Sequence, residues 1–226
     1  MAYILHLETT TQQCSVALSF KGKCIAEKEL LTEHFSHGEK LHVFIQEVLH
    51  HANVEFSQLD AIAISKGPGS YTGLRIGVAA AKGLCFALDL PLIAIQTLEL
   101  LVAPFFGNSE YAFFIPMLDA RRMEVYTAVF DASKNWIQQT NALVLSEHSF
   151  YELVGQSPCL VIGNGASKFQ AIHPKINARF TEKVHYPSAK EMTQLAWIQF
   201  ECKNFEDLAT FEPYYLKDFQ TTPSKK

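Results

Sequence analysis

The chain has 226 residues, of which 48% are hydrophobic and 19% charged, and its formal net charge is −4 at pH 7. This composition excludes a disordered chain, and the 11 Gly and 9 Pro residues exclude a collagen-like or low-complexity one. The acidic balance argues against a chain that binds nucleic acid tightly by itself, because such chains usually carry a strong basic surplus.

Cysteine usage and hydropathy predict the cellular compartment of the protein. The 5 Cys form no CxxC pair and are widely scattered, unlike a secreted disulfide framework or a zinc ribbon. The opening MAYILHLETT lacks the basic segment of a signal peptide, and no apolar run approaches the roughly 18 residues of a membrane span. We therefore expect a reduced, cytoplasmic protein with no membrane association.

The hydrophobic pattern predicts strands and helices in a regular order along the first half of the chain. A helix is indicated where apolar residues recur at i, i+3, i+4, i+7 and i+8, and strands where they alternate or form short runs. In chain order these are strands 3–8, 13–20 and 23–30, helix 37–51, strand 60–65, a glycine loop 67–73, helix 74–88, strand 91–95 and helix 97–103.

The same order starts again after the break at 104–108. Its elements are strands 111–118, 124–130 and 135–143, helix 146–154, strand 159–163, and a glycine turn into a helix. A helix at 188–202 and a tail follow. The order strand-strand-strand-helix-strand-helix, found twice, predicts an α/β fold of two duplicated lobes with largely parallel crossovers. We expect a first lobe at 1–103, a second at 104–187, and a segment at 188–226 that packs back on the first. Two such lobes with a cleft between them are typical of the actin-like ATPase (ASKHA) superfamily.

The most informative stretch is the glycine loop KGPGSYTGLRIG at 66–77. A glycine loop between a strand and a helix presents backbone N–H groups and the positive end of the helix dipole, which suits an anion. The spacing matches neither a P-loop nor a dinucleotide-binding turn. The alternative is a sharp turn with a helix cap at Ser70.

The helix after this loop carries small residues four apart, at Gly73, Gly77 and Ala81, with Ala80 beside them. Glycine within a helix is less favourable than alanine by roughly 1 kcal/mol, so this flat face indicates a close approach. The approaching element is either the helix's own lobe or another chain.

These residues resemble those of the TsaB family of bacterial proteins, which are needed to make threonylcarbamoyladenosine in tRNA. The motif GPGSYTGLRIG after DAIAIS is the strongest part of the resemblance. ILHLETTTQQCSVAL, HGEKLHVFIQEVL and IPMLDARRMEVYTAVF also resemble family segments, as does FEPYYLKDF, with Lys217 where Arg is usual. The resemblance covers essentially the whole chain.

The resemblance implies a non-catalytic subunit. In that reading the chain pairs with the similarly folded transferase TsaD through helices of its first lobe, forms a homodimer when alone, and is joined by the ATPase TsaE. It implies no cofactor of its own, since ATP and threonylcarbamoyl-adenylate are used by the complex, and it implies contact with tRNA only through the complex. The expected partner-binding residues are Leu41, Phe44, Ile45, Gly73, Leu74, Gly77, Ala80 and Ala81. The motif loop comprises Gly67, Pro68, Gly69, Ser70, Tyr71, Thr72 and Arg75.

Two hairpin turns bear on catalysis, because an actin-like ATPase needs a flexible turn with a carboxylate in each lobe. The first turn, at Glu8 and Thr9, has hydroxyls but no glycine, and the second follows Asp119 with two arginines. We therefore expect at most weak nucleotide contact at Glu8, Thr9 and Asp119, and no catalytic residue. The alternatives are a small-molecule kinase or ATPase of the same superfamily and, less favoured, a glycoprotease-like peptidase.

Histidines and cations complete the candidate residues. No HExxH is present and His37 and His42 are five apart, so they do not share a helix face and no metal site is expected. His34 offers no better spacing. Cations that would help to hold tRNA within a complex are Arg121, Arg122, Lys217, Lys225 and Lys226.

Overall fold

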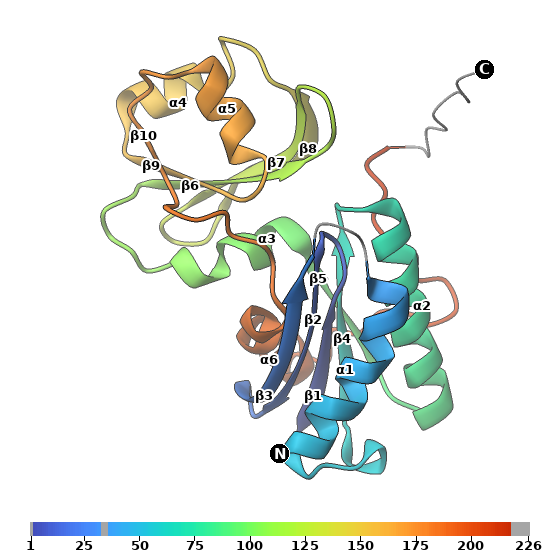
Figure 1. Ribbon diagram of the computed structural model, residues 1–226. Coiled ribbons are helices and arrows are strands. Elements are labelled where there is room, and N and C mark those ends of the chain that lie inside the picture. Colours follow the sequence, from blue (N-terminus) through green and yellow to red (C-terminus); the bar gives the residue numbers. More distant parts are fainter. Residues whose placement is uncertain (1, 33–35, 218–226) are drawn as a thin grey trace, which may run out of the picture.

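The computed structural model describes residues 2–32 and 36–217, which form two lobes, each built on a five-stranded mixed sheet (Figure 1). The first sheet has the strand order β3-β2-β1-β4-β5 and the second β10-β9-β6-β7-β8. In each, three antiparallel strands continue into two parallel ones, so the predicted duplicated α/β fold is confirmed.

The first sheet is covered on both faces. Its strands are β1 (Tyr3–Glu8), β2 (Gln13–Phe20), β3 (Lys23–Leu31), β4 (Ala61–Gly67) and β5 (Leu92–Gln96). Helices α1 (His37–Ala52) and α2 (Tyr71–Leu88) lie on one face, where the alternate residues Leu5 and Leu7 point. Helix α6 (Met192–Glu201) lies on the other face with Ile4 (Figure 1).

The second lobe has shorter helices. Its strands are β6 (Phe113–Asp119), β7 (Glu124–Asp131), β8 (Trp136–Val144), β9 (Cys159–Ile162) and β10 (Ala178–Phe180). Its helices α4 (Tyr151–Gln156) and α5 (Ala166–Ile172) cover one face. The opposite face packs on α3 (Thr97–Val102), which contributes Leu98 and Leu101 to this core and Leu100 to that of the first lobe. Helix α3 therefore joins the two lobes. Single 3₁₀ turns lie at Phe56–Gln58, Ala103–Phe105 and Ala189–Glu191.

Several elements differ from the sequence predictions. Helix α2 begins at Tyr71, three residues earlier than expected, because the Ser70 side chain accepts a hydrogen bond from the backbone N–H of Gly73 and caps the helix. The helix predicted at 146–154 shrinks to α4, because the Ser149 hydroxyl accepts the backbone N–H of Ser146 and holds a turn there. The short strand β10 was not predicted.

The segment after α6 contacts the first lobe over its described residues. Residues 203–217, which we name the C-terminal strap, run from α6 past β5 and α2 toward the second lobe (Figure 1). Lys225, Lys226 and His34, considered from the sequence, lie outside the described residues.

Candidate functional site

The glycine loop packs against the β1–β2 turn of its own lobe and forms hydrogen bonds with it. The Ser70 backbone N–H donates to the Thr10 carbonyl at 2.7 Å, and the Thr9 hydroxyl donates to the Gly73 carbonyl at 2.8 Å. Thr9 and Thr10 are almost fully buried as a result. The β1–β2 turn is thus covered by the first turns of α2.

The small residues of α2 are explained by this contact. A Cβ on Gly73 would overlap the Thr9 carbonyl oxygen, and a Cβ on Gly77 would overlap the Thr9 hydroxyl and come within 3.0 Å of Ile64. Of the two readings of the small-residue face, packing within the lobe is therefore the correct one. Substituting Gly77 with a bulky residue would disturb the lobe itself and would not report on pairing alone.

The predicted partner-binding residues need a matching correction. Residues that recur along one side of α1 and α2 point into the first-lobe core: Leu41, Phe44, Ile45, Gly73, Leu74, Gly77 and Ala81 are buried, and Ala80 is partly buried. The apolar periodicity identified the side of each helix that packs on the first-lobe sheet. The exposed faces of the same helices are those available to another chain.

Glu8 lies at the end of β1 and is fully buried. One of its oxygens accepts the backbone N–H and the hydroxyl of Thr10, each at 2.5 Å, and the other accepts the Ser65 hydroxyl. Burial raises the pKa of Glu8 from its ordinary value of 4.5 to about 7, against the lowering effect of these hydrogen bonds. Both Glu8 oxygens therefore accept hydrogen bonds from groups inside the first lobe.

Asp119, at the end of β6, occupies the equivalent position in the second lobe but is 40% exposed. Its carboxylate pairs with Lys168 at 2.8 Å and accepts the backbone N–H of Arg121 at 2.7 Å. Both Arg121 and Arg122 have positive φ, of 69° and 49°. The β6–β7 turn is therefore a tight turn made of two arginines, and it has no glycine. The two hairpin carboxylates thus have different surroundings and different partners.

The histidines are dispersed. His37 is buried, with Nε2 2.7 Å from the Thr11 carbonyl oxygen, whereas His42 lies on the exposed face of α1. Over residues 2–32 and 36–217, no three His, Cys, Asp or Glu side chains gather where they could hold a metal ion.

The C-terminal strap completes the site by covering the glycine loop. The Tyr214 backbone N–H donates to the Lys66 carbonyl at 2.6 Å, and Lys82 donates to the Phe211 carbonyl at 2.9 Å. Tyr215 packs on Tyr71, with ring centroids 4.9 Å apart. The sequence predicted a C-terminal segment that packs back on the first lobe but did not place these contacts, although the PYYLK motif was a signal that could have done so.

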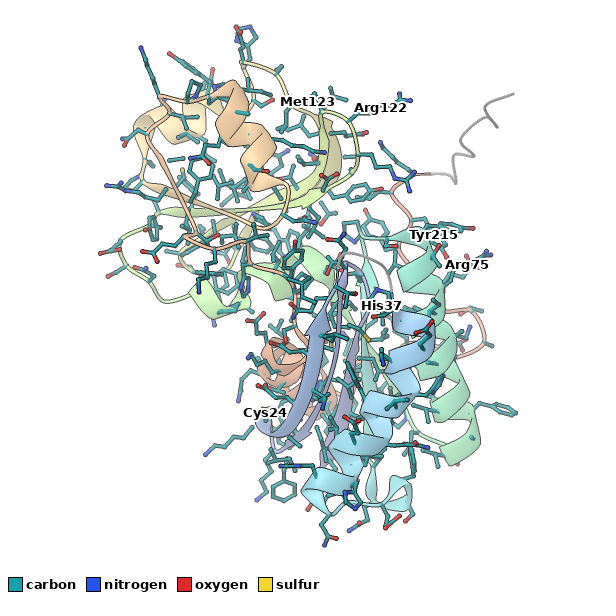
Figure 2. The ribbon with its side chains drawn as sticks, viewed as in Figure 1. Cys24, His37, Arg75, Arg122, Met123 and Tyr215 are labelled. Atoms are coloured by element: carbon teal, nitrogen blue, oxygen red, sulfur yellow. The ribbon has the colours of Figure 1, made fainter. Side chains whose placement is uncertain are left out.

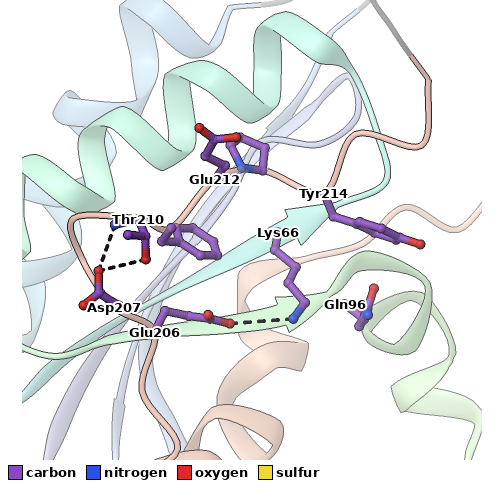
Figure 3. A pocket seen from close by; sticks show the side chains of 9 residues that line it. Lys66, Gln96, Glu206, Asp207, Thr210, Glu212 and Tyr214 are labelled. Atoms are coloured by element: carbon purple, nitrogen blue, oxygen red, sulfur yellow. Dashed lines mark hydrogen bonds and ion pairs between the residues drawn. The ribbon is translucent and has the colours of Figure 1, made fainter.

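An open cavity of about 590 Å³ lies between the strap and the carboxyl ends of β4 and β5 (Figure 3). Lys66 and Glu206 form an ion pair across it at 3.6 Å, and Gln96 and Tyr214 line its wall. Asp207 on its rim is held by Thr210, whose backbone N–H and hydroxyl donate to it. The polar groups of this cavity mainly fix the strap to the first lobe.

Comparison with known proteins decides the family. A model of the family described as "TsaD: tRNA N6-adenosine threonylcarbamoyltransferase" matches residues 32–222. The chain belongs to this family. A transferase of this kind from Ligilactobacillus salivarius is 25% identical over 89% of the chain, and the match spans 56% of the length of that enzyme.

Full-length relatives carry the name TsaB. The tRNA threonylcarbamoyladenosine biosynthesis protein TsaB of Haemophilus influenzae is 28% identical over 95% of this chain and 93% of its own. TsaB of Escherichia coli is 27% identical, with coverage of 95% and 94%. The expected resemblance to TsaB is confirmed.

Solved structures show the same fold. YeaZ from Pseudomonas aeruginosa superposes with a TM-score of 0.79 at 24% identity, covering 96% of this chain and 100% of its own. An activator of 2-hydroxyisocaproyl-CoA dehydratase from Clostridium difficile, with bound ADPNP, superposes with a TM-score of 0.52 at 8% identity, covering 89% and 97%. The two-lobed actin-like architecture is thereby confirmed. Within the described residues of this chain, no helix is long and apolar enough to cross a bilayer.

Proposed function

We propose that the chain is a non-catalytic scaffold subunit in the synthesis of threonylcarbamoyladenosine in tRNA, and that it pairs with a TsaD-like transferase. A TsaE-like ATPase joins the pair, and the ATP and threonylcarbamoyl-adenylate are used by the complex. The observation that carries this proposal is the filled first hairpin: Thr9 and Thr10 are bonded to the start of α2, where a nucleotide phosphate would have to lie.

The carboxylates support a non-catalytic role. Holding Mg-ATP needs oxygen ligands that are open to the cleft. Both oxygens of Glu8 accept hydrogen bonds from buried groups, and Asp119 pairs with Lys168. The chain alone is therefore expected neither to turn over ATP nor to transfer threonylcarbamoyl groups.

The partner surface in this proposal is formed by the exposed side of α1 and by the exposed side of α2 from Ala79 to Phe86. On α2, Ala79 and Gly83 are exposed small residues and Phe86 is 84% exposed, and on α1 Val43 is 44% exposed. Nothing would lie within 4 Å of a Cβ on Gly83, so this side of the helix is open. A partner of the same family fold presents a corresponding helix pair, and small residues let two such pairs approach closely. The homodimer expected for the isolated chain would use the same surface.

Charge at this surface is expected to weaken pairing. Replacing Phe86 with glutamate buries an unpaired carboxylate in the interface and should weaken binding to the transferase at least 10-fold. The fold should not change, because the Phe86 side chain contributes little to the core. Affinity measured by titration calorimetry checks this.

A matched control is Ile198→Glu on α6, since Ile198 is 55% exposed and lies across the sheet from α2. Equal affinities for the Phe86 and Ile198 variants would place the interface elsewhere.

Reconstitution tests the function itself. Transferase, threonylcarbamoyl-adenylate and unmodified tRNA are combined with or without this chain, and modified adenosine is quantified. We expect strong stimulation by the chain and no product from the chain alone. Full transferase activity without the chain, or ATP turnover by the chain that Asp119→Ala removes, would contradict the proposal.

A further inference from the structure

Aromatic and cationic side chains gather where the C-terminal strap crosses from the first lobe to the second. Tyr71 begins α2 and Tyr215 lies on the strap, and their rings pack at 4.9 Å. The Arg75 guanidinium lies over the Tyr71 ring, 4.9 Å from its centroid, and also interacts electrostatically with Tyr215. Arg75 and Tyr215 remain exposed, the latter by 37% (Figure 2).

The C-terminal strap continues from Tyr215 to the second lobe. Lys217 forms an ion pair with Glu124 at the start of β7, and both Lys217 and Arg121 act electrostatically on Tyr126. Arg121 and Arg122 form the exposed β6–β7 turn, whose Arg122 lies on the same side of the molecule as Tyr215 in Figure 2. In the described part of the chain, neither of these guanidinium groups forms an ion pair.

The chemistry of this cluster differs from that of the rest of the surface. The chain as a whole is acidic, yet here the exposed Arg75 lies against two packed tyrosines. Lys217, two residues after Tyr215, and the exposed Arg121 both act on Tyr126 in the second lobe. The negative charge of Glu212 lies near Tyr215 and partly offsets the positive charge of the arginines. Lys217 is neutralised by its ion pair with Glu124. Arginine next to exposed aromatic rings suits single-stranded RNA, since phosphates pair with the guanidinium groups and unpaired bases stack on the rings.

We infer that this tyrosine–arginine surface, formed by Tyr71, Arg75, Arg121, Arg122 and Tyr215, contacts unpaired nucleotides of the tRNA substrate. The inference rests on the proposed function and names which surface of this chain meets the RNA. Three arginines supply too little charge for tight binding alone, so the surface acts together with the transferase partner. It orients RNA and has no part in the chemical step.

The test uses a fluorescein-labelled anticodon stem–loop RNA and the complex of the full chain with its transferase partner. Fluorescence anisotropy gives the affinity as salt is varied. Arg75→Ala and Tyr215→Ala should each weaken binding at least 5-fold. Arg121→Asn/Arg122→Gly preserves the positive-φ turn and should reduce the slope of log affinity against log salt by roughly 1 to 2.

Two controls separate RNA contact from other effects. Arg179→Ala removes an exposed arginine from β10, outside the surface, and should bind like wild type. A blunt duplex RNA of the same length lacks unpaired bases and should bind more weakly than the stem–loop.

Failure of this inference is distinct from failure of the proposed function. Formation of the complex is measured separately by light scattering, and ultraviolet crosslinking of the isolated chain to the stem–loop at low salt needs no partner. A crosslink at Tyr215 or Tyr71 supports the inference even if no complex forms. Wild-type affinity in all three surface variants, or equal binding of duplex and stem–loop, overturns it.

Discussion

Replacing Gly73 with alanine is expected to lower the free energy of unfolding by about 3 kcal/mol. The added Cβ would overlap the Thr9 carbonyl oxygen, which belongs to the backbone and has little freedom to move. The hydrogen bond from the Thr9 hydroxyl to the Gly73 carbonyl would also be strained. Urea unfolding followed by circular dichroism measures the change.

Gly83 offers a control within the same helix, since a Cβ there meets no atom within 4 Å. Gly83→Ala should raise the free energy of unfolding by up to about 1 kcal/mol, because alanine favours helix more than glycine does. If Gly73→Ala proved as harmless as Gly83→Ala, α2 would not be seated on the β1–β2 turn and the explanation for the filled hairpin would fail.

The second large effect concerns Glu8 and pH. Its pKa is about 7 in the folded protein and 4.5 when unperturbed, so between these values the folded state binds the additional proton. Stability from this group therefore falls as pH rises from about 4.5 to about 7, by roughly 3 kcal/mol for a shift of this size. Glu8→Gln cannot ionise and keeps groups able to bond Thr10 and Ser65. The variant should gain about this much stability over wild type between pH 4.5 and pH 8.

His6 acts in the opposite direction and masks the effect in wild-type protein alone. It is fully buried, and burial lowers its pKa from 6.5 to about 3, so its contribution to stability is lost as pH falls through this range. The difference between Glu8→Gln and wild type, measured by urea unfolding at each pH, cancels the His6 contribution. Glu110→Gln, in an exposed loop, shows the effect of removing a surface charge. A difference for Glu8→Gln that stayed flat with pH would mean that Glu8 is not buried as a proton-binding group.

Local sequence signals predicted most of the framework. The bounds of β1 and β2 agree with the alternation of residues 3–8 and 13–20, and α1 agrees with the spacing of Leu41, Ile45 and Val48. The repeated order of elements was sufficient to predict two like lobes. Such patterns succeed because they depend on neighbours within a few residues along the chain.

The candidate site depended on contacts that no local pattern contains. Whether Gly73 faces its own lobe or another chain is decided by Thr9, 64 positions away, and the burial of Glu8 by Ser65, 57 positions away. Apolar spacing on α1 and α2 identified a face that must be covered, and it is covered by the lobe's own sheet. The contacts of the strap were not predicted, because Tyr214 and Tyr215 have their partners near residues 66–75, far away along the chain.

Light scattering coupled to size-exclusion chromatography tests the proposed scaffold role most directly. The chain is measured alone and mixed with the TsaD-like transferase of the same organism. We expect a homodimer alone that exchanges for a one-to-one heterodimer on mixing, because both assemblies use the exposed sides of α1 and α2. No complex at any ratio, even with the TsaE-like ATPase, ATP and tRNA present, would contradict the scaffold role.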